Sequence, residues 1–150
     1  TTVADGEISV IWEHSYLLWF DQNNRPKLEK RKPPPGPALK QARWAVSGQG
    51  VLVDSGRLYP GASTFPDDRT AVGIDPELGM LWMVVFEHCS PHRAGQVLRD
   101  LGARDVILLD GGTSTSMALG RDAAHVRPGT VHTGYIPVAN HFGIRAEPVE

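Results

Sequence analysis

The residues best suited to chemistry lie at the end of an apolar run in the last third of the chain. Residues 106–119 read VILLDGGTSTSMAL, so the run stops at Asp110, two glycines and four hydroxyl residues. An ionised carboxylate at the end of a buried strand needs hydrogen bonds or a cation. Gly111 and Gly112 allow positive φ and a close approach to a ligand, and consecutive amides in such a corner bind anions. The hydroxyl groups that follow suit phosphate or sugar oxygens; they belong to Thr113, Ser114, Thr115 and Ser116.

Better-known motifs do not account for this corner. The Gly-Lys-Ser/Thr of a P-loop, the Gly-x-Ser-x-Gly nucleophile elbow and the Gly-x-Gly-x-x-Gly dinucleotide fingerprint are all missing. Cys89 is the sole cysteine, which excludes a cysteine metal site, and the clustered acidic ligands of a calcium loop are absent. We therefore predict no metal ion and no cofactor, with ligation of a divalent cation such as calcium as the alternative role for Asp110. Taken alone, DGGTSTS also fits a plain turn.

Three other positions place polar side chains beside apolar stretches. In DDRTAVGID, Arg69 and Thr70 open an apolar strand, and the Arg69 guanidinium offers a planar, permanently charged fork for phosphate. In IPVANHFGI, Asn140 lies in a short polar break. A surface ion pair is the alternative for Arg69, and a turn is the alternative for Asn140. The adjacent Glu87 and His88 would face opposite sides of a strand, and a general base at His88 is the less favoured interpretation.

Together these stretches resemble the phosphodiester glycosidase family. Four family motifs match in order: Arg-Thr-Ala-x-Gly at 69–73, Leu-Gly-Ala at 101–103, Asn-Leu-Asp-Gly-Gly-Gly-Ser-Ser/Thr at 108–115 and Arg-Pro-Val-Ala-Asn at 136–140. The departures are Leu108 for Asn, Thr113 for the third Gly and Ile136 for Arg. Phe86, Glu87 and His88 stand where the family has Asp-Gly-Arg. The similarity extends over about residues 44–146.

The resemblance implies hydrolysis of a sugar-1-phosphodiester at the anomeric carbon, in a glycan or glycoconjugate. Asp110 would stabilise the sugar centre or activate water, and Arg69 would stabilise the phosphate. The substrate-binding residues would be Thr70, Gly111, Gly112, Thr113, Ser114, Thr115, Asn140, Glu87 and His88. We expect Arg69 and Asp110 to line one cleft. The alternative is a non-catalytic glycan- or phosphoglycan-binding module on the same fold.

The family also implies an exported protein, secreted or periplasmic, and a further segment upstream. Its Asn-Gly-Gly-aromatic-Phe motif is missing here, and TTVADGEISV resembles the stretch that normally follows it. We therefore expect a domain without its N-terminal segment. A second polypeptide, a symmetry-related copy or an upstream segment would then lie along the open sheet edge.

The composition predicts a folded scaffold for this chemistry. The 150 residues amount to one domain, 1–150, with 41% hydrophobic and 21% charged residues. The net charge of −2 argues against nucleic-acid binding, and no apolar run of membrane-spanning length is present. Residues 25–43 carry seven basic residues, one acidic residue and five prolines. We expect a basic, Pro-rich surface loop there, with an arm for a phosphate or an acidic partner as the sharper alternative.

Strands are predicted for most of the remaining chain. ISVIW, YLLWF, WAVSG, GVLVD, DVILLD, STSMALG and HFGIRAE are candidate strands, and DDRTAVGID and GMLWMVVFE form a predicted hairpin. One helix follows Ser90, with Pro91 in its first turn and Gly102 after its end. Its apolar face would be Ala94, Val97, Leu98 and Leu101. The predicted fold is therefore α+β: a β-rich mixed sheet domain with one main helix packed on the sheet.

Overall fold

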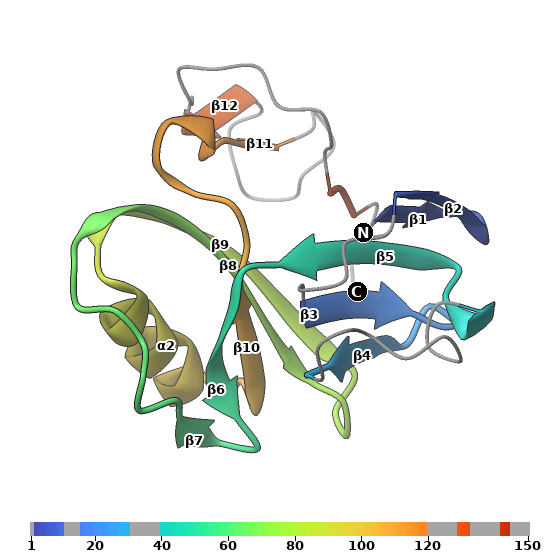
Figure 1. Cartoon of the computed structure of the whole chain (residues 1–150), viewed down its shortest axis with the longest axis horizontal. Coiled ribbons are helices and arrows are strands. Elements are labelled where there is room, and N and C mark those ends of the chain that lie inside the picture. The colour runs from blue at the N-terminus through green and yellow to red at the C-terminus, as the bar shows by residue number, and fades with distance from the viewer. Residues whose placement is uncertain (1, 11–15, 31–39, 120–128, 133–141, 145–150) are drawn as a thin grey trace, which may run out of the picture.

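The computed structural model describes residues 2–10, 16–30, 40–119, 129–132 and 142–144. These residues form two five-stranded sheets, a two-stranded ribbon and the ten-residue helix α2 (Figure 1). The predicted α+β class, with a main helix packed on a sheet, is confirmed. The described strand pairs are all antiparallel, so the sheets are not mixed, and the strands divide between separate sheets.

The first sheet is built from the N-terminal third of the chain. Its strands are β1 (Thr2–Ala4), β2 (Glu7–Val10), β3 (Tyr16–Phe20), β4 (Pro26–Glu29) and β5 (Trp44–Gly48), in the order β2-β1-β5-β3-β4. The predicted loop over residues 25–43 is wrong for Pro26–Glu29, which pairs with β3 as an edge strand. An edge strand tolerates Pro26 at its first position. The Pro-Pro-Pro run lies outside the described residues.

The second sheet carries the predicted hairpin. Its strands are β6 (Gly50–Asp54), β7 (Arg57–Leu58), β8 (Asp67–Asp75), β9 (Met80–Cys89) and β10 (Asp105–Leu108), in the order β7-β6-β10-β8-β9. The β8–β9 turn follows Asp75, which is 6% exposed and accepts the main-chain N–H groups of Glu77 at 2.9 Å and Leu78 at 3.1 Å. Gly79 closes the turn at φ +66°, which a residue with a side chain rarely adopts.

The chain passes from the first sheet to the second through Gly48, Gln49 and Gly50. The candidate strands WAVSG and GVLVD are both present, as β5 and β6, and they lie in different sheets. A Cβ on Gly48 would lie 2.8 Å from the main-chain oxygen of Leu108. The Gln49 N–H donates to the same oxygen at 2.7 Å. Glycine at position 48 therefore permits the close approach that fixes Gln49 beside the end of β10.

The second sheet is buried on both faces. One cluster lies against α2 and comprises Leu52, Val53, Ala71, Ala94, Leu98, Ala103, Val106 and Leu108. Another lies between the two sheets and comprises Leu18, Phe20, Val51, Val72, Ile74 and Ile107. Along β10, Ile107 belongs to the second cluster and its neighbours Val106 and Leu108 to the first, as the alternation of side chains along a strand requires. Burial on both faces explains why these strands are continuously apolar.

Helix α2 (Pro91–Asp100) begins and ends as predicted. Ser90 Oγ accepts the Arg93 N–H at 3.2 Å, and Gly102 follows the helix at φ +104°. The buried helix residues are Pro91, Ala94, Gly95 and Leu98. The prediction that Leu101 packs on the sheet is wrong: Leu101 lies past the last helical residue and is 56% exposed. No helix among the described residues is long and apolar enough to cross a membrane.

Lys30 links the two sheets at the end of β4. Its ammonium group contacts Asp54, at the end of β6, and lies 2.8 Å from Asp105 Oδ1, at the start of β10. Burial lowers the pKa of Lys30, but the hydrogen bonds and charges of Asp105 and Asp54 together outweigh it, so this pKa is raised. The hydrogen bond from Lys30 lowers the pKa of Asp54. The three charged groups form the Lys30 clamp.

The segment that opened the sequence analysis is a strand, a corner and a second strand, as predicted. β10 is followed by the 3₁₀ turn η1 (Gly112–Ser114) and then by β11 (Met117–Leu119). β11 pairs only with β12 (Gly129–His132) among the described strands, and this ribbon lies apart from the two sheets in Figure 1. Phe142 to Ile144 has no regular structure, and the rest of the predicted strand at HFGIRAE lies outside the described residues.

Candidate active site

Antiparallel pairing of β8 with β10 brings Arg69 next to the Asp110 corner. Leu108 is opposite Ala71, and the Leu109 N–H donates to the Thr70 carbonyl at 2.9 Å. A Cβ on Gly111 would lie 2.8 Å from the main-chain oxygen of Asp68 and 3.6 Å from Cδ of Arg69. The corner therefore packs directly on the start of β8, and positions 41 apart in sequence become neighbours.

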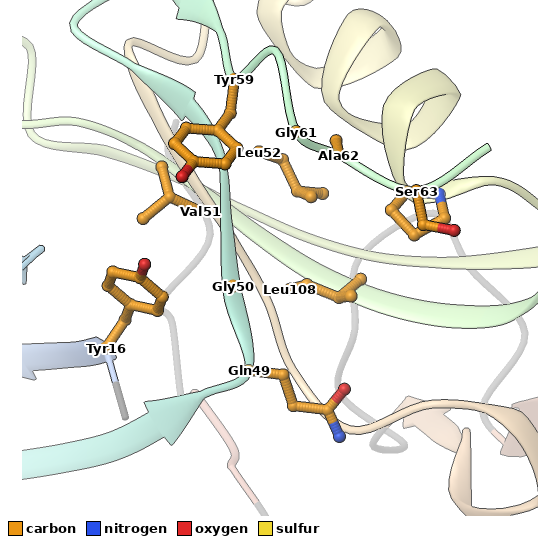
Figure 2. A pocket seen from close by; sticks show the side chains of 11 residues that line it. Tyr16, Gln49, Gly50, Val51, Leu52, Tyr59, Gly61, Ala62, Ser63 and Leu108 are labelled. Atoms are coloured by element: carbon orange, nitrogen blue, oxygen red, sulfur yellow. The ribbon is translucent and has the colours of Figure 1, made fainter. Parts of the chain in front are cut away.

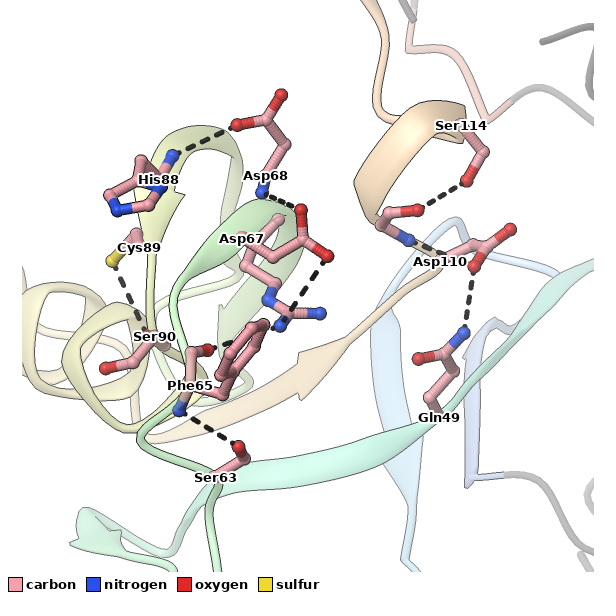
Figure 3. Close-up of polar contacts among 12 residues, drawn as sticks. Gln49, Ser63, Phe65, Asp67, Asp68, His88, Cys89, Ser90, Asp110 and Ser114 are labelled. Atoms are coloured by element: carbon pink, nitrogen blue, oxygen red, sulfur yellow. Dashed lines mark hydrogen bonds and ion pairs between the residues drawn. The ribbon is translucent and has the colours of Figure 1, made fainter. Parts of the chain in front are cut away.

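Asp110 is exposed and is held by two donors. Its Oδ1 accepts Gln49 Nε2 at 2.9 Å and the Gly111 N–H at 3.0 Å (Figure 3). The second bond uses the amide that the sequence analysis assigned to an anion, so that amide is occupied inside the protein. Gln49 was not among the predicted site residues. Its only sequence feature is a polar side chain between two glycines where one apolar strand ends and the next begins.

Arg69 lies under the loop that leads into β8. Its side chain is 16% exposed, and Nη2 donates to the Phe65 carbonyl at 3.3 Å and lies 4.0 Å from Asp67 Oδ2. Nε is buried and has no hydrogen-bond partner among the described residues. A buried donor without an acceptor is costly. Because Nε is inaccessible, an oxygen ligand would have to bind through the Nη atoms of this 16% exposed side chain.

A β-bulge places Glu87 and His88 opposite Asp68. Arg69 pairs with Phe86 and Asp67 pairs with Cys89, so two residues of β9 face one residue of β8. His88 has φ +45°, and its N–H donates to Asp68 Oδ1 at 3.0 Å. Both Glu87 and His88 are exposed. The regular strand assumed for this pair is wrong, because the bulge interrupts the alternation of side chains.

The remaining corner residues differ in their access to a ligand. Ser114 Oγ donates to the Gly111 carbonyl at 2.8 Å, which stabilises the turn. Thr115 is fully buried, and its Oγ1 has no hydrogen-bond partner in the described structure. Thr113 is exposed and Thr70 half-buried. Gly112 has φ +63°, and a Cβ there would lie 3.3 Å from Asp67 Oδ2. Asn140 lies outside the described residues.

A pocket of about 260 Å³ adjoins the corner along β6 (Figure 2). Its walls include two tyrosines, Tyr16 and Tyr59, together with Gln49, Ser63 and Leu108. Gln49 is thus shared between the pocket wall and Asp110. The sequence analysis did not identify this pocket, because its residues come from β3, the β5–β6 link, β6, the loop after β7, α2 and β10.

The described residues contain no group of three or more histidine, cysteine, aspartate and glutamate side chains that could hold a metal ion. His88 and His92 are four positions apart, a spacing found in zinc-binding helices. His88, however, lies in the β9 bulge, and only His92 lies in α2. The two rings therefore do not share a helix face.

Comparison with known proteins identifies the fold and the family. The catalytic domain of zebrafish N-acetylglucosamine-1-phosphodiester alpha-N-acetylglucosaminidase, auto-inhibited by its pro-peptide, superposes with a TM-score of 0.66 at 17% identity. The match covers 79% of this chain and 47% of that chain, so the protein spans about half the length of the zebrafish domain. A hypothetical protein from Synechocystis matches at 21% identity with a TM-score of 0.44, over 73% of this chain and 31% of its own.

A search of curated protein sequences found no match. The family model for phosphodiester glycosidase (NAGPA) matches residues 1–145, nearly the whole chain. The chain belongs to the phosphodiester glycosidase family.

Proposed function

We propose that this protein hydrolyses the bond between the anomeric carbon of a sugar and a phosphodiester. The observation that carries the proposal is the packing of the corner after β10, which begins with Asp110, on the start of β8: a Cβ on Gly111 would lie 3.6 Å from Cδ of Arg69. Family membership supports the same reaction class. The proposed substrate is a sugar-1-phosphodiester in a glycan or glycoconjugate.

The proposed reaction divides between the two side chains. The bond from the anomeric carbon to the phosphate oxygen breaks, and the leaving phosphate monoester takes the electron pair. The Arg69 guanidinium stabilises the charge that develops on that phosphate. Asp110 stabilises the positive charge at the anomeric carbon or takes the proton of the water that attacks it. The Gln49 amide and the Gly111 N–H hold the carboxylate in position for either role.

The charge around the corner favours a substrate of low negative charge. Asp67 Oδ2 lies 4.0 Å from Arg69 Nη2, and the residues on either side of the corner add two more carboxylates, those of Asp68 and Asp110. A phosphodiester carries one negative charge, whereas the monoester product carries up to two near neutral pH. The excess of carboxylates would therefore repel the product more strongly than the substrate and assist its release.

A hydrolysis screen tests the proposal. The full-length protein is incubated with a panel of sugar-1-phosphodiesters and UDP-sugars, and release of free sugar is measured. We expect turnover by the wild type, loss of turnover in Asp110→Asn, and normal turnover in the control Asp100→Asn, which alters an exposed helix-terminal residue bonded to Arg99. Binding of the panel without turnover would support the non-catalytic phosphoglycan-binding module instead.

Two further expectations from family membership belong to the same proposal. We propose that the protein acts outside the cytoplasm, in a secreted or periplasmic location. We also propose that another chain segment or a second copy completes the domain. Fractionation of the native host checks the first, and light scattering on the purified full-length protein checks the second.

A further inference from the structure

We propose that the pocket lined by Tyr16, Tyr59 and Gln49 is a subsite for the sugar ring whose anomeric carbon reacts. This assignment rests on the proposed function and names the part of the substrate that the pocket holds. The volume of about 260 Å³ lies below the roughly 300–1,000 Å³ of pockets for drug-sized ligands and suits a single ring.

Neither proposed catalytic residue lines the pocket, but each is linked to one of its lining residues by hydrogen bonds. On one side, Gln49 lines the pocket and donates to Asp110 at 2.9 Å. On the other side, Ser63 lines the pocket and its Oγ accepts the Phe65 N–H at 3.1 Å, while the Phe65 carbonyl accepts Arg69 Nη2 at 3.3 Å (Figure 3). A ring in the pocket therefore lies next to the carboxylate that would act on its anomeric carbon, with the guanidinium one loop away.

Gln49 presents an acceptor to this space. A carboxylate only accepts hydrogen bonds, so the contact with Asp110 requires the NH₂ group of Gln49 to face that residue. The orientation of the amide is thereby fixed, and Oε1 of Gln49 remains without a protein donor among the described residues. A sugar hydroxyl is a donor of the right kind for this oxygen.

The two tyrosines provide the amphipathic wall that a sugar ring needs. Both phenol hydroxyls are turned toward the same space beside β6 in Figure 2. Tyr59 is 46% exposed, yet its position is fixed: its N–H donates to the Leu52 carbonyl at 2.8 Å, and a Cβ on Gly61 would lie 3.1 Å from its ring. A rigid aromatic face with a polar tip binds the C–H surface of a sugar at low entropic cost.

The test measures binding of neutral sugars separately from hydrolysis. Saturation-transfer NMR is recorded on the full-length protein with methyl α-glucoside, methyl α-galactoside, methyl α-mannoside and methyl N-acetyl-α-glucosaminide, none of which carries phosphate. The variants are Tyr59→Ala, Tyr59→Phe and Asp110→Asn, with Leu78→Ala as control because Leu78 is 73% exposed at the β8–β9 turn. Thermal unfolding of each variant shows whether it is folded.

We expect at least one glycoside to bind the wild type and Leu78→Ala equally, and Asp110→Asn more weakly, because a carboxylate no longer fixes the Gln49 amide. Tyr59→Ala should weaken this binding about tenfold, and Tyr59→Phe, which keeps the ring, should weaken it less. On the hydrolysed substrate, Tyr59→Ala should lower kcat/KM by a similar factor. The subsite is refuted if no glycoside binds the wild type, or if a folded Tyr59→Ala binds and turns over normally. Binding that depends on Tyr59 without any hydrolysis would refute the proposed function and leave the subsite standing.

Discussion

At the scale of single residues, Arg69 has a buried N–H donor and lies beside the proposed reaction centre. Its Nε is buried without a partner among the described residues, which lowers the stability of the fold. The hydrogen bond from its Nη2 to the Phe65 carbonyl raises that stability. We expect Arg69→Met to leave the free energy of unfolding within about 1 kcal/mol of the wild type. We also expect kcat/KM for a sugar-1-phosphodiester to fall by about 100-fold or more. Thermal unfolding and steady-state kinetics measure the two effects.

Arg104→Met is the matched control for this experiment. Arg104 Nη1 lies 2.7 Å from Glu77 Oε1 in an exposed ion pair near the β8–β9 turn. Its loss should change neither stability nor turnover appreciably. A parallel loss of stability and activity in Arg69→Met would assign Arg69 a structural role instead.

Position 111 requires glycine because a side chain would not fit there, and not because of its φ angle. A Cβ at this position would lie 2.8 Å from the main-chain oxygen of Asp68, which cannot move without displacing the start of β8. We expect Gly111→Ala to lower the free energy of unfolding by about 1–3 kcal/mol. Gly50→Ala should have little effect, because nothing lies within 4 Å of a Cβ there. Chemical denaturation of both variants measures the difference, and equal stability of the two would contradict the close packing of the corner on β8.

At the scale of elements, the β8–β9 hairpin depends on the side chain of Asp75. This carboxylate is almost fully buried and accepts two main-chain N–H groups of the turn. We expect Asp75→Ala to lower the free energy of unfolding by about 1–3 kcal/mol, because both amides lose their acceptor. Asp75→Asn retains a side-chain oxygen and should lose less. Denaturation of both variants decides: identical losses would show that the acceptor is not what stabilises the turn.

The elements that could be predicted are those set by neighbouring residues. The α2 boundaries follow from Ser90, Pro91 and Gly102, and the β8–β9 hairpin follows from its turn residues, so both were predicted correctly. The division into two sheets and the β9 bulge depend on which strands become neighbours in the folded protein. No local pattern in the sequence contains that information.

In the candidate site too, some features follow from the local sequence and others only from the fold. The sequence predicted Arg69 and Asp110 as site residues from residue type and motif order, and antiparallel pairing packs the Asp110 corner on the start of β8. Their roles in a reaction stay predictions. Gln49 was missed because its function depends on its bond to Leu108, a residue of a distant strand. The occupied amide of Gly111 was also unpredictable, since only the turn geometry directs it at Asp110.

At the scale of the whole molecule, the Lys30 clamp makes stability depend on pH at both extremes. The lowered pKa of Asp54 means that its contribution is present above its ordinary value of 3.8 and is lost as pH falls through the folded-state value. The raised pKa of Lys30 means that its contribution is present below 10.5 and is lost as pH rises through the folded-state value. The clamp therefore stabilises the fold between these limits.

We expect Lys30→Met to lower the free energy of unfolding by about 1 kcal/mol at pH 7, a modest value because solvent screens the half-exposed Asp54. The difference from the wild type should shrink below about pH 4 and above about pH 10.5. Lys40→Met is the control, since Lys40 is exposed and has no ion pair among the described residues. Urea denaturation across this pH range measures both variants. A pH-independent difference would mean that Lys30 contributes through packing and not through charge.

The passage from Gly48 to Gly50 has an evolutionary consequence. Within three residues it changes sheets, bonds to the end of β10 and supplies the side chain that holds Asp110. An inserted or deleted residue would turn Gln49 away from Asp110 and disturb its bond to Leu108. Relatives that retain this arrangement should therefore keep this link at a constant length.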